Sequence, residues 1–153
     1  MRHARTRARK EEGFLQRLVD ALRLAASDYE TQVRALPPDQ VCTADEIAIT
    51  YGDSFLLAGQ ILSAGLITQR QYDELKALDG FFSAMSGQEH AELWTLDALR
   101  EGAEWMEVRT RARKLLDVLG VAHAPPDLSW IVFVPSRPGD PDDATRGIEF
   151  DEP

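Results

Sequence analysis

Residues 61–75, ILSAGLITQRQYDEL, contain the signals that end one helix and begin the next within a few residues. Gly65 followed by Leu66 is typical of a left-handed helix stop with its hydrophobic contact, because glycine adopts positive φ without steric cost. Thr68 and Gln71 have the spacing of a capping box, in which each side chain accepts a hydrogen bond from the other residue's backbone N–H. The stretch therefore predicts two helices joined by a tight turn.

The same stretch resembles the short helical hairpin of SHOCT domains. Those domains share the turn of Gly, two apolar residues and Thr, followed by a polar run and an aromatic residue, here Tyr72. We take a helical hairpin from this resemblance and no function.

Helix signals continue toward the N-terminus. Apolar residues recur at steps of three and four over residues 11–36, which predicts a long amphipathic helix, and Pro37 ends it. Thr43 and Glu46 have capping-box spacing, so a second helix begins there. Its apolar residues lie on nearly all faces, which predicts a central and well-covered helix. Gly52 is its weak point, where we expect a kink or break.

Toward the C-terminus the pattern gives two further helices and an irregular segment. Residues 72–85 form the third helix, and Gln88 to Gly102 is the least regular part of the body, where Thr95 can cap a short helix. A last clear helix covers residues 105–119 and ends at Gly120.

These boundaries predict an all-α protein with a single helical domain of four to five helices and a C-terminal tail carrying one short strand or hairpin. We divide the chain into a basic flexible arm (1–10), the helical domain (11–124), and a C-terminal strand with an acidic Pro/Gly-rich tail (125–153). A strand that is apolar on both faces must pair, with residues 148–150 or with another chain. The strand-pairing candidates are Trp130, Ile131, Val132, Phe133 and Val134.

Charge is distributed unevenly along the chain. The first ten residues hold five basic side chains and no acid, which leaves 17 − 5 = 12 basic residues against 26 acidic ones and a formal net charge of 12 − 26 = −14 for residues 11–153. A body this acidic repels phosphate backbones and anionic lipid and attracts cationic surfaces. We therefore expect a basic protein partner and no nucleic acid.

The sequence favours the cytoplasm. Cys42 is the single cysteine, so no internal disulfide can form. The segment after the basic start contains Arg17, Asp20 and Arg23, which breaks the apolar core that an export signal needs. No run approaches the roughly 18 apolar residues of a membrane helix. We expect neither export nor a membrane.

No motif indicates catalysis. The chain contains neither GxGxxG nor GxxxxGK[ST], and no GxSxG elbow surrounds a serine. His3, His90 and His123 have no second ligand at helical spacing, whereas a zinc site needs three or four convergent ligands. We expect no metal, no cofactor and no catalytic residue.

An acidic cluster with two tryptophans is the candidate interaction site. Asp97, Glu101 and Glu104 share one face if the helix continues through Gly102. One interpretation is a solvated acidic face over two core tryptophans; the other is a docking patch with aromatic anchors and a charged rim. The partner-binding candidates are Glu89, Glu92, Trp94, Asp97, Glu101, Glu104, Trp105 and Glu107.

The leading functional hypothesis is a non-enzymatic intracellular binding protein, a bacterial immunity protein or antitoxin-type inhibitor of a basic protein toxin. Two alternatives stay open. A helical transcriptional regulator would use the hairpin around Gly65, although residues 69–86 carry more acidic than basic side chains, which is wrong for a DNA groove. A structural or assembly protein would use the C-terminal strand to form a homodimer.

Overall fold

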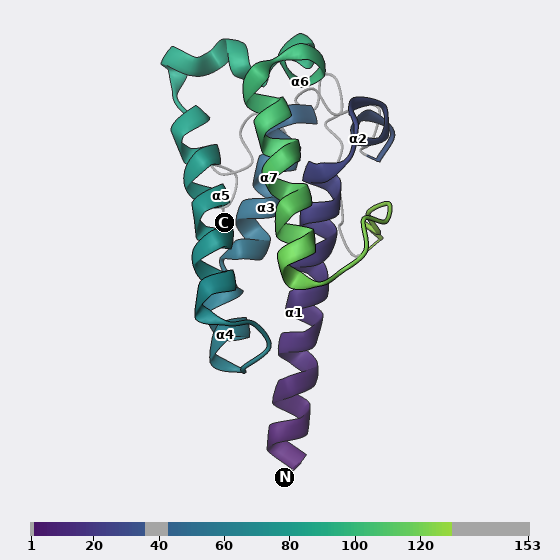
Figure 1. Ribbon diagram of the computed structural model, residues 1–153, viewed down its shortest axis with the longest axis vertical. Coiled ribbons are helices and arrows are strands. Elements are labelled where there is room, and N and C mark those ends of the chain that lie inside the picture. The colour runs from purple at the N-terminus through teal and green to yellow at the C-terminus, as the bar shows by residue number, and fades with distance from the viewer. Residues whose placement is uncertain (1, 36–42, 130–153) are drawn as a thin grey trace, which may run out of the picture.

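The computed structural model describes residues 2–35 and 43–129. Its four long helices are α1 (Arg2–Ala26), α3 (Thr43–Phe55), α5 (Gln69–Met85) and α7 (Ala103–Leu119). They run alternately up and down the long axis of the molecule (Figure 1). Helices α1 and α5 each pack against both α3 and α7, so the four helices close into a bundle. The all-α prediction is confirmed for these residues, among which no strand occurs.

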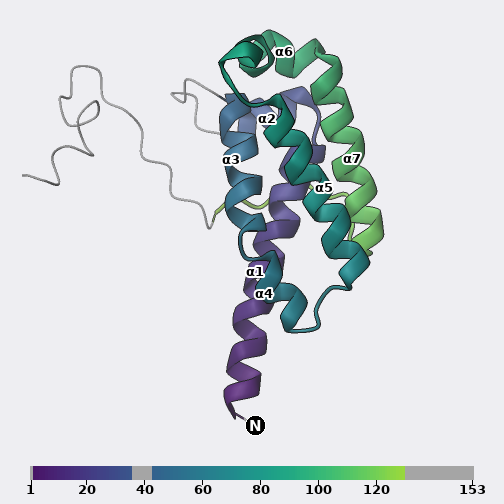
Figure 2. The same ribbon diagram turned by 90° about the vertical axis from the view of Figure 1, so that its left-hand side faces the viewer.

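Short elements cover the two ends of the bundle. Helix α2 (Tyr29–Ala35), the 3₁₀ segment η1 (Gln88–Trp94) and helix α6 (Leu96–Glu101) lie at one end, and helix α4 (Ala58–Ser63) lies at the other (Figures 1 and 2). The described residues thus form seven α-helices, more than the four to five expected, because two predicted long helices are each divided in two.

The first division follows Ala26. The Oδ1 atom of Asp28 accepts a hydrogen bond of 2.8 Å from the backbone N–H of Thr31, which is the geometry that begins a new helix, α2. The same hydrogen bond lowers the pKa of the Asp28 carboxyl. The second division falls at residues 56–57, after α3 has ended at Phe55. Gly52 lies inside α3, so the break expected there occurs a turn later.

The predicted turn around Gly65 is confirmed. Gly65 has φ of 78°, and the N–H of Leu66 donates to the carbonyl of Ile61 at 3.2 Å. The N–H of Gln71 donates to Thr68 Oγ1 at 3.1 Å, while Gln71 Oε1 accepts from the Thr68 N–H at 2.8 Å. The left-handed stop at the end of α7 is confirmed as well, because the residue that follows it, Gly120, has φ of 72°.

Aromatic rings form the centre of the core. Tyr51 and Trp105 are fully buried, and Phe82 lies between them with ring centroids 5.7 Å and 6.0 Å away. The Tyr51 hydroxyl donates to the carbonyl of Leu75 at 2.6 Å. Burial raises the pKa of the Tyr51 phenol, so this group stays a neutral hydrogen-bond donor. These contacts join α3, α5 and α7.

A buried arginine joins three further elements. Arg109 of α7 is 7% exposed, and its Nε donates to the carbonyl of Ser27 at 3.2 Å. Its Nη2 donates to Gln32 Oε1 at 2.8 Å and to the carbonyl of Leu99 in α6.

The C-terminal end of α1 is capped by the same group of side chains. Gln32 and Arg113 donate to its last carbonyls, those of Leu24, Ala25 and Ala26. Two guanidinium groups therefore lie at the negative end of the α1 dipole, which stabilises the burial of Arg109.

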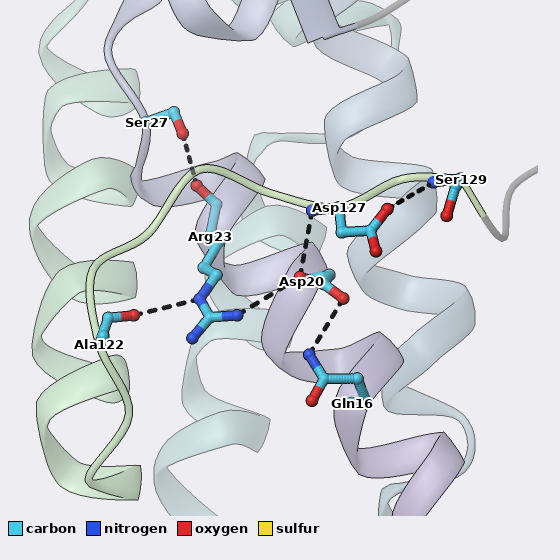
Figure 3. Close-up of polar contacts among 7 residues, drawn as sticks. All are labelled: Gln16, Asp20, Arg23, Ser27, Ala122, Asp127 and Ser129. Carbon is cyan, nitrogen blue, oxygen red and sulfur yellow. Dashed lines mark hydrogen bonds and ion pairs between the residues drawn. The ribbon is translucent and has the colours of Figure 1, made fainter.

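The segment that follows α7 crosses α1 (Figure 3). Arg23 Nε donates to the carbonyl of Ala122 at 3.1 Å, and the N–H of Asp127 donates to Asp20 Oδ1 at 3.2 Å. Asp20 is buried and also lies 3.6 Å from Arg23 Nη1. Residues 125–129, the described part of the predicted tail, are thus held against the bundle. The three-part division of the chain stays a prediction, although α1 already begins at Arg2.

Candidate functional site

A shallow groove of about 550 Å³ lies where the start of α3 meets the end of α5 and η1. Figure 2 shows η1 at the same end of the bundle as the first turns of α3. The residues that line the groove are Asp45, Ala48, Ile49, Ser86, Gly87, Gln88, Ala91 and Trp94. Most of the side chains on its walls are apolar or small, and none is Lys or Arg.

Two indole groups hold the irregular wall of this groove in place. Trp94 Nε1 donates to the carbonyl of Met85 at 2.9 Å, and Trp105 Nε1 donates to the carbonyl of Leu93 at 2.7 Å. The two rings pack edge to face with centroids 5.5 Å apart. Gly87 turns the chain out of α5 with φ of 109°, a value that side chains rarely adopt. The position of η1 is therefore fixed although its backbone is irregular.

The two tryptophans of the predicted site differ in accessibility. Trp105 is fully buried in the core, so a partner cannot reach it without unfolding the protein. Trp94 is partly exposed and lines the groove. Of the two interpretations left open by the sequence, the core interpretation describes Trp105, and Trp94 alone is placed to act as an anchor.

The predicted acidic cluster is divided by the structure. Gly102 is extended, with φ of −71° and ψ of 140°, and separates α6 from α7. The helix does not continue through it, so the condition for Asp97, Glu101 and Glu104 to share one face is not met. Glycine fits this break because it has no side chain: a Cβ on Gly102 would lie 2.5 Å from the carbonyl oxygen of Ala98.

Three of the six predicted carboxylates already have a cationic neighbour. Asp97 and Glu101 lie 3.1 Å and 3.3 Å from the same nitrogen of Arg100. Glu107 lies 2.9 Å from Arg111 Nε, and Glu104 is partly buried in the first turn of α7.

The remaining two acidic candidates lie beside the groove. Glu89 and Glu92 are exposed residues of η1, which contributes a wall of the groove. Together with Trp94, they are the part of the predicted site that the structure brings together.

The α3 side of the site was not among the predicted residues. Asp45 and Ile49 line the groove, and Ile49 is 51% exposed. The expectation that this helix would be well covered is wrong at Ile49 and also at Leu56, which is 78% exposed just after α3. An amphipathic helix packs only one stripe against the core, and the opposite side faces solvent even where it is apolar.

A signal for this side was present in the spacing of basic residues. The chain has no Lys or Arg between Arg34 and Arg70, and none between Lys76 and Arg100. These two intervals supply both walls of the groove. The described carboxylates in them are Asp45, Glu46, Asp53, Asp79, Glu89, Glu92 and Asp97. The two chain segments that form the groove therefore carry only negative formal charges among their described residues.

Other predicted features have a plain outcome. The strand-pairing candidates Trp130 to Val134 lie outside the described residues. His123 Nε2 lies 2.8 Å from Asp117 Oδ1, and no group of three His, Cys, Asp or Glu side chains within residues 2–35 and 43–129 is placed to hold a metal ion. Within the same ranges, no helix has the length and apolar composition needed to cross a bilayer.

The chain matches no protein-family model, no curated protein and no solved structure.

Proposed function

We propose that this protein is a non-enzymatic binding protein for a basic protein partner, an immunity protein or antitoxin-type inhibitor that acts in the cytoplasm. The observation that carries the proposal is the groove beside Trp94, whose walls are mostly apolar or small, include the carboxylate of Asp45 and hold no Lys or Arg. The chain segments that form these walls carry only acidic formal charges.

Each part of this arrangement has a physical role in binding. Partly exposed aromatic side chains in the centre of a patch are typical of binding hot spots, and apolar neighbours such as Ile49 exclude water when a partner covers them. Carboxylates around the patch create a negative potential that accelerates the approach of a cationic partner and repels acidic ones. A partner with Lys and Arg around an apolar protrusion fits both properties.

The test begins with the full chain immobilised as bait for a lysate of its native host. A captured protein supports the proposal only if it meets three conditions. It must be basic, it must arrest growth when it is expressed alone in cells, and co-expression of this protein must relieve the arrest. Association rates are then measured at about 0.05 M and 0.5 M salt, since the Debye length falls below about 10 Å over this range.

Two matched double variants locate the binding surface. Glu89→Lys with Glu92→Lys reverses charge beside the groove, whereas Glu12→Lys with Asp73→Lys makes the same change in net charge on exposed residues near the other end of the bundle. We expect the first pair to slow association several times more than the second. Equal rates for the two pairs, an acidic partner, or rates that ignore salt would contradict the proposal.

A further inference from the structure

The accessible part of Trp94 offers no hydrogen-bond donor. A tryptophan side chain has one polar hydrogen, on Nε1. In this protein Nε1 donates to the carbonyl of Met85 at 2.9 Å, while Trp105 packs against the ring edge to face. What remains exposed in the groove can therefore offer a ligand only carbon atoms and π electrons.

The surroundings of this π surface favour a cation. The face of an indole carries partial negative charge and attracts a guanidinium or ammonium group within about 6 Å of its centre. The carboxylate of Asp45 lines the same groove, and Glu89 and Glu92 are exposed on the adjacent η1. No lining residue supplies a positive charge of the protein's own.

Elsewhere in the molecule, the same combination of an aromatic ring and a carboxylate already binds an arginine. The guanidinium carbon of Arg111 lies 4.7 Å from the centre of the Phe81 ring, and Arg111 Nε lies 2.9 Å from Glu107. An aromatic face and a carboxylate thus hold one arginine on the α5 and α7 side of the bundle. The groove is lined by the aromatic ring of Trp94 and the carboxylate of Asp45, and no Lys or Arg lies among its lining residues.

We infer that the groove is the subsite for a single arginine side chain of the partner, stacked on Trp94 with its charge toward the carboxylates. The inference rests on the proposed function and specifies what the partner inserts. Arginine fits better than lysine, because its planar guanidinium stacks on aromatic rings and is weakly hydrated.

The first test uses two synthetic peptides of identical sequence, with flanking lysines and either arginine or citrulline at the centre. Citrulline keeps the shape of arginine and has no charge. Titration of the ¹⁵N-labelled full chain is followed by the indole N–H resonances. We expect the arginine peptide to bind roughly 3- to 30-fold more tightly and to shift the Trp94 resonance with little change at Trp105. Equal affinities for the two peptides would overturn the inference.

The second test separates stacking from simple apolar contact. Trp94→Phe keeps an aromatic face, Trp94→Leu keeps an apolar side chain, and both lose the same hydrogen bond to Met85. We expect the phenylalanine variant to retain most of the preference for arginine over citrulline and the leucine variant to lose it. The inference is wrong if the two variants show the same preference.

The two proposals fail in different ways. If charge reversal at Glu89 and Glu92 abolishes binding of the natural partner but the two Trp94 variants are equivalent, the docking surface stands and the arginine subsite does not. If that charge reversal leaves partner binding unchanged, the groove is not the docking surface and the proposed function is overturned with it.

Discussion

Replacement of Arg109 by methionine should lower the free energy of unfolding more than replacement of any other charged residue of α7. The substitution keeps an unbranched apolar stem and deletes the guanidinium, so three acceptors lose their donor: the carbonyls of Ser27 and Leu99 and the side-chain oxygen of Gln32. A buried acceptor left unsatisfied costs about 1–3 kcal/mol, and a partly buried one less. We expect Arg109→Met to lower the free energy of unfolding by about 3–6 kcal/mol.

Urea denaturation followed by circular dichroism measures this loss. At an m-value of about 2 kcal/mol/M, the midpoint should fall by about 1.5–3 M. The matched control is Arg111→Met on the same helix. The Arg111 side chain is 42% exposed, pairs with Glu107 and stacks on Phe81, so its removal should cost at most about 2 kcal/mol.

A double-mutant cycle tests the physical reason. If the loss comes from stranded acceptors, Gln32→Leu should cost less in the Arg109→Met background than in the wild type, because Gln32 Oε1 has already lost its donor. We expect a coupling of about 1–3 kcal/mol. Additive effects, or a loss at Arg109 no larger than the loss at Arg111, would refute the assignment of Arg109 as the polar tie between α1, α2, α6 and α7.

Three further predictions concern backbone conformation and pH. Gly52→Ala should raise stability by about 0.5–1 kcal/mol, because Gly52 lies inside α3 with open space for a Cβ. Gly120→Ala should lower stability by about 1–2 kcal/mol, because Gly120 has a positive φ. Thermal melts of the two variants measure both effects. Gly102→Ala should lower stability by about 1–3 kcal/mol, because its Cβ would meet a backbone carbonyl of α6, and a normal melting temperature would contradict the requirement for glycine at this position. Hydrogen bonds from Thr31 and Ser129 lower the pKa values of Asp28 and Asp127 below the ordinary 3.8. Their contribution to the free energy of unfolding is therefore complete above pH 3.8 and is lost as the pH falls through the lower folded values. Urea melts of Asp28→Asn and Asp127→Asn should show a weaker acid dependence than the wild type.

Local signals in the sequence were sufficient for the turns. The stop at Gly65, the caps at Thr68 and Thr95 and the stop at Gly120 all occur as predicted, because each depends on residues within one helical turn. Asp28 is also a local signal, because its carboxylate can begin a helix. The apolar periodicity continues through it to Val33, however, and predicted a single helix. Apolar periodicity shows which residues face the core. It does not reveal a short break after which the same side chains still face the core.

The site required tertiary information. Trp105 begins the apolar stripe of α7 with Val108 and Ala112, which is a local signal for burial, whereas the irregular segment around Trp94 has no periodicity that places its ring. That Trp94 lines a groove depends on how η1 packs beside α3 and α5. Arg109 is indistinguishable by type from Arg111 and Arg113, although it alone of the three is buried. The groove itself joins residues about 40 positions apart, and its α3 wall could be found only by noticing where basic residues are missing.

The arginines of α6 and α7 are all used in contacts of their own. Arg23, Arg109 and Arg113 donate to backbone carbonyls, and Arg100 and Arg111 pair with acids of their own helices. Ion pairs between residues three or four apart contribute a few tenths of a kcal/mol on a helix surface, and α6 and α7 contain them. A lysine in α3 or η1 would offer the same gain and would reduce repulsion among the carboxylates, yet neither element contains one. The segments that form the groove therefore keep their negative charge, which the proposed capture of a cationic partner would use.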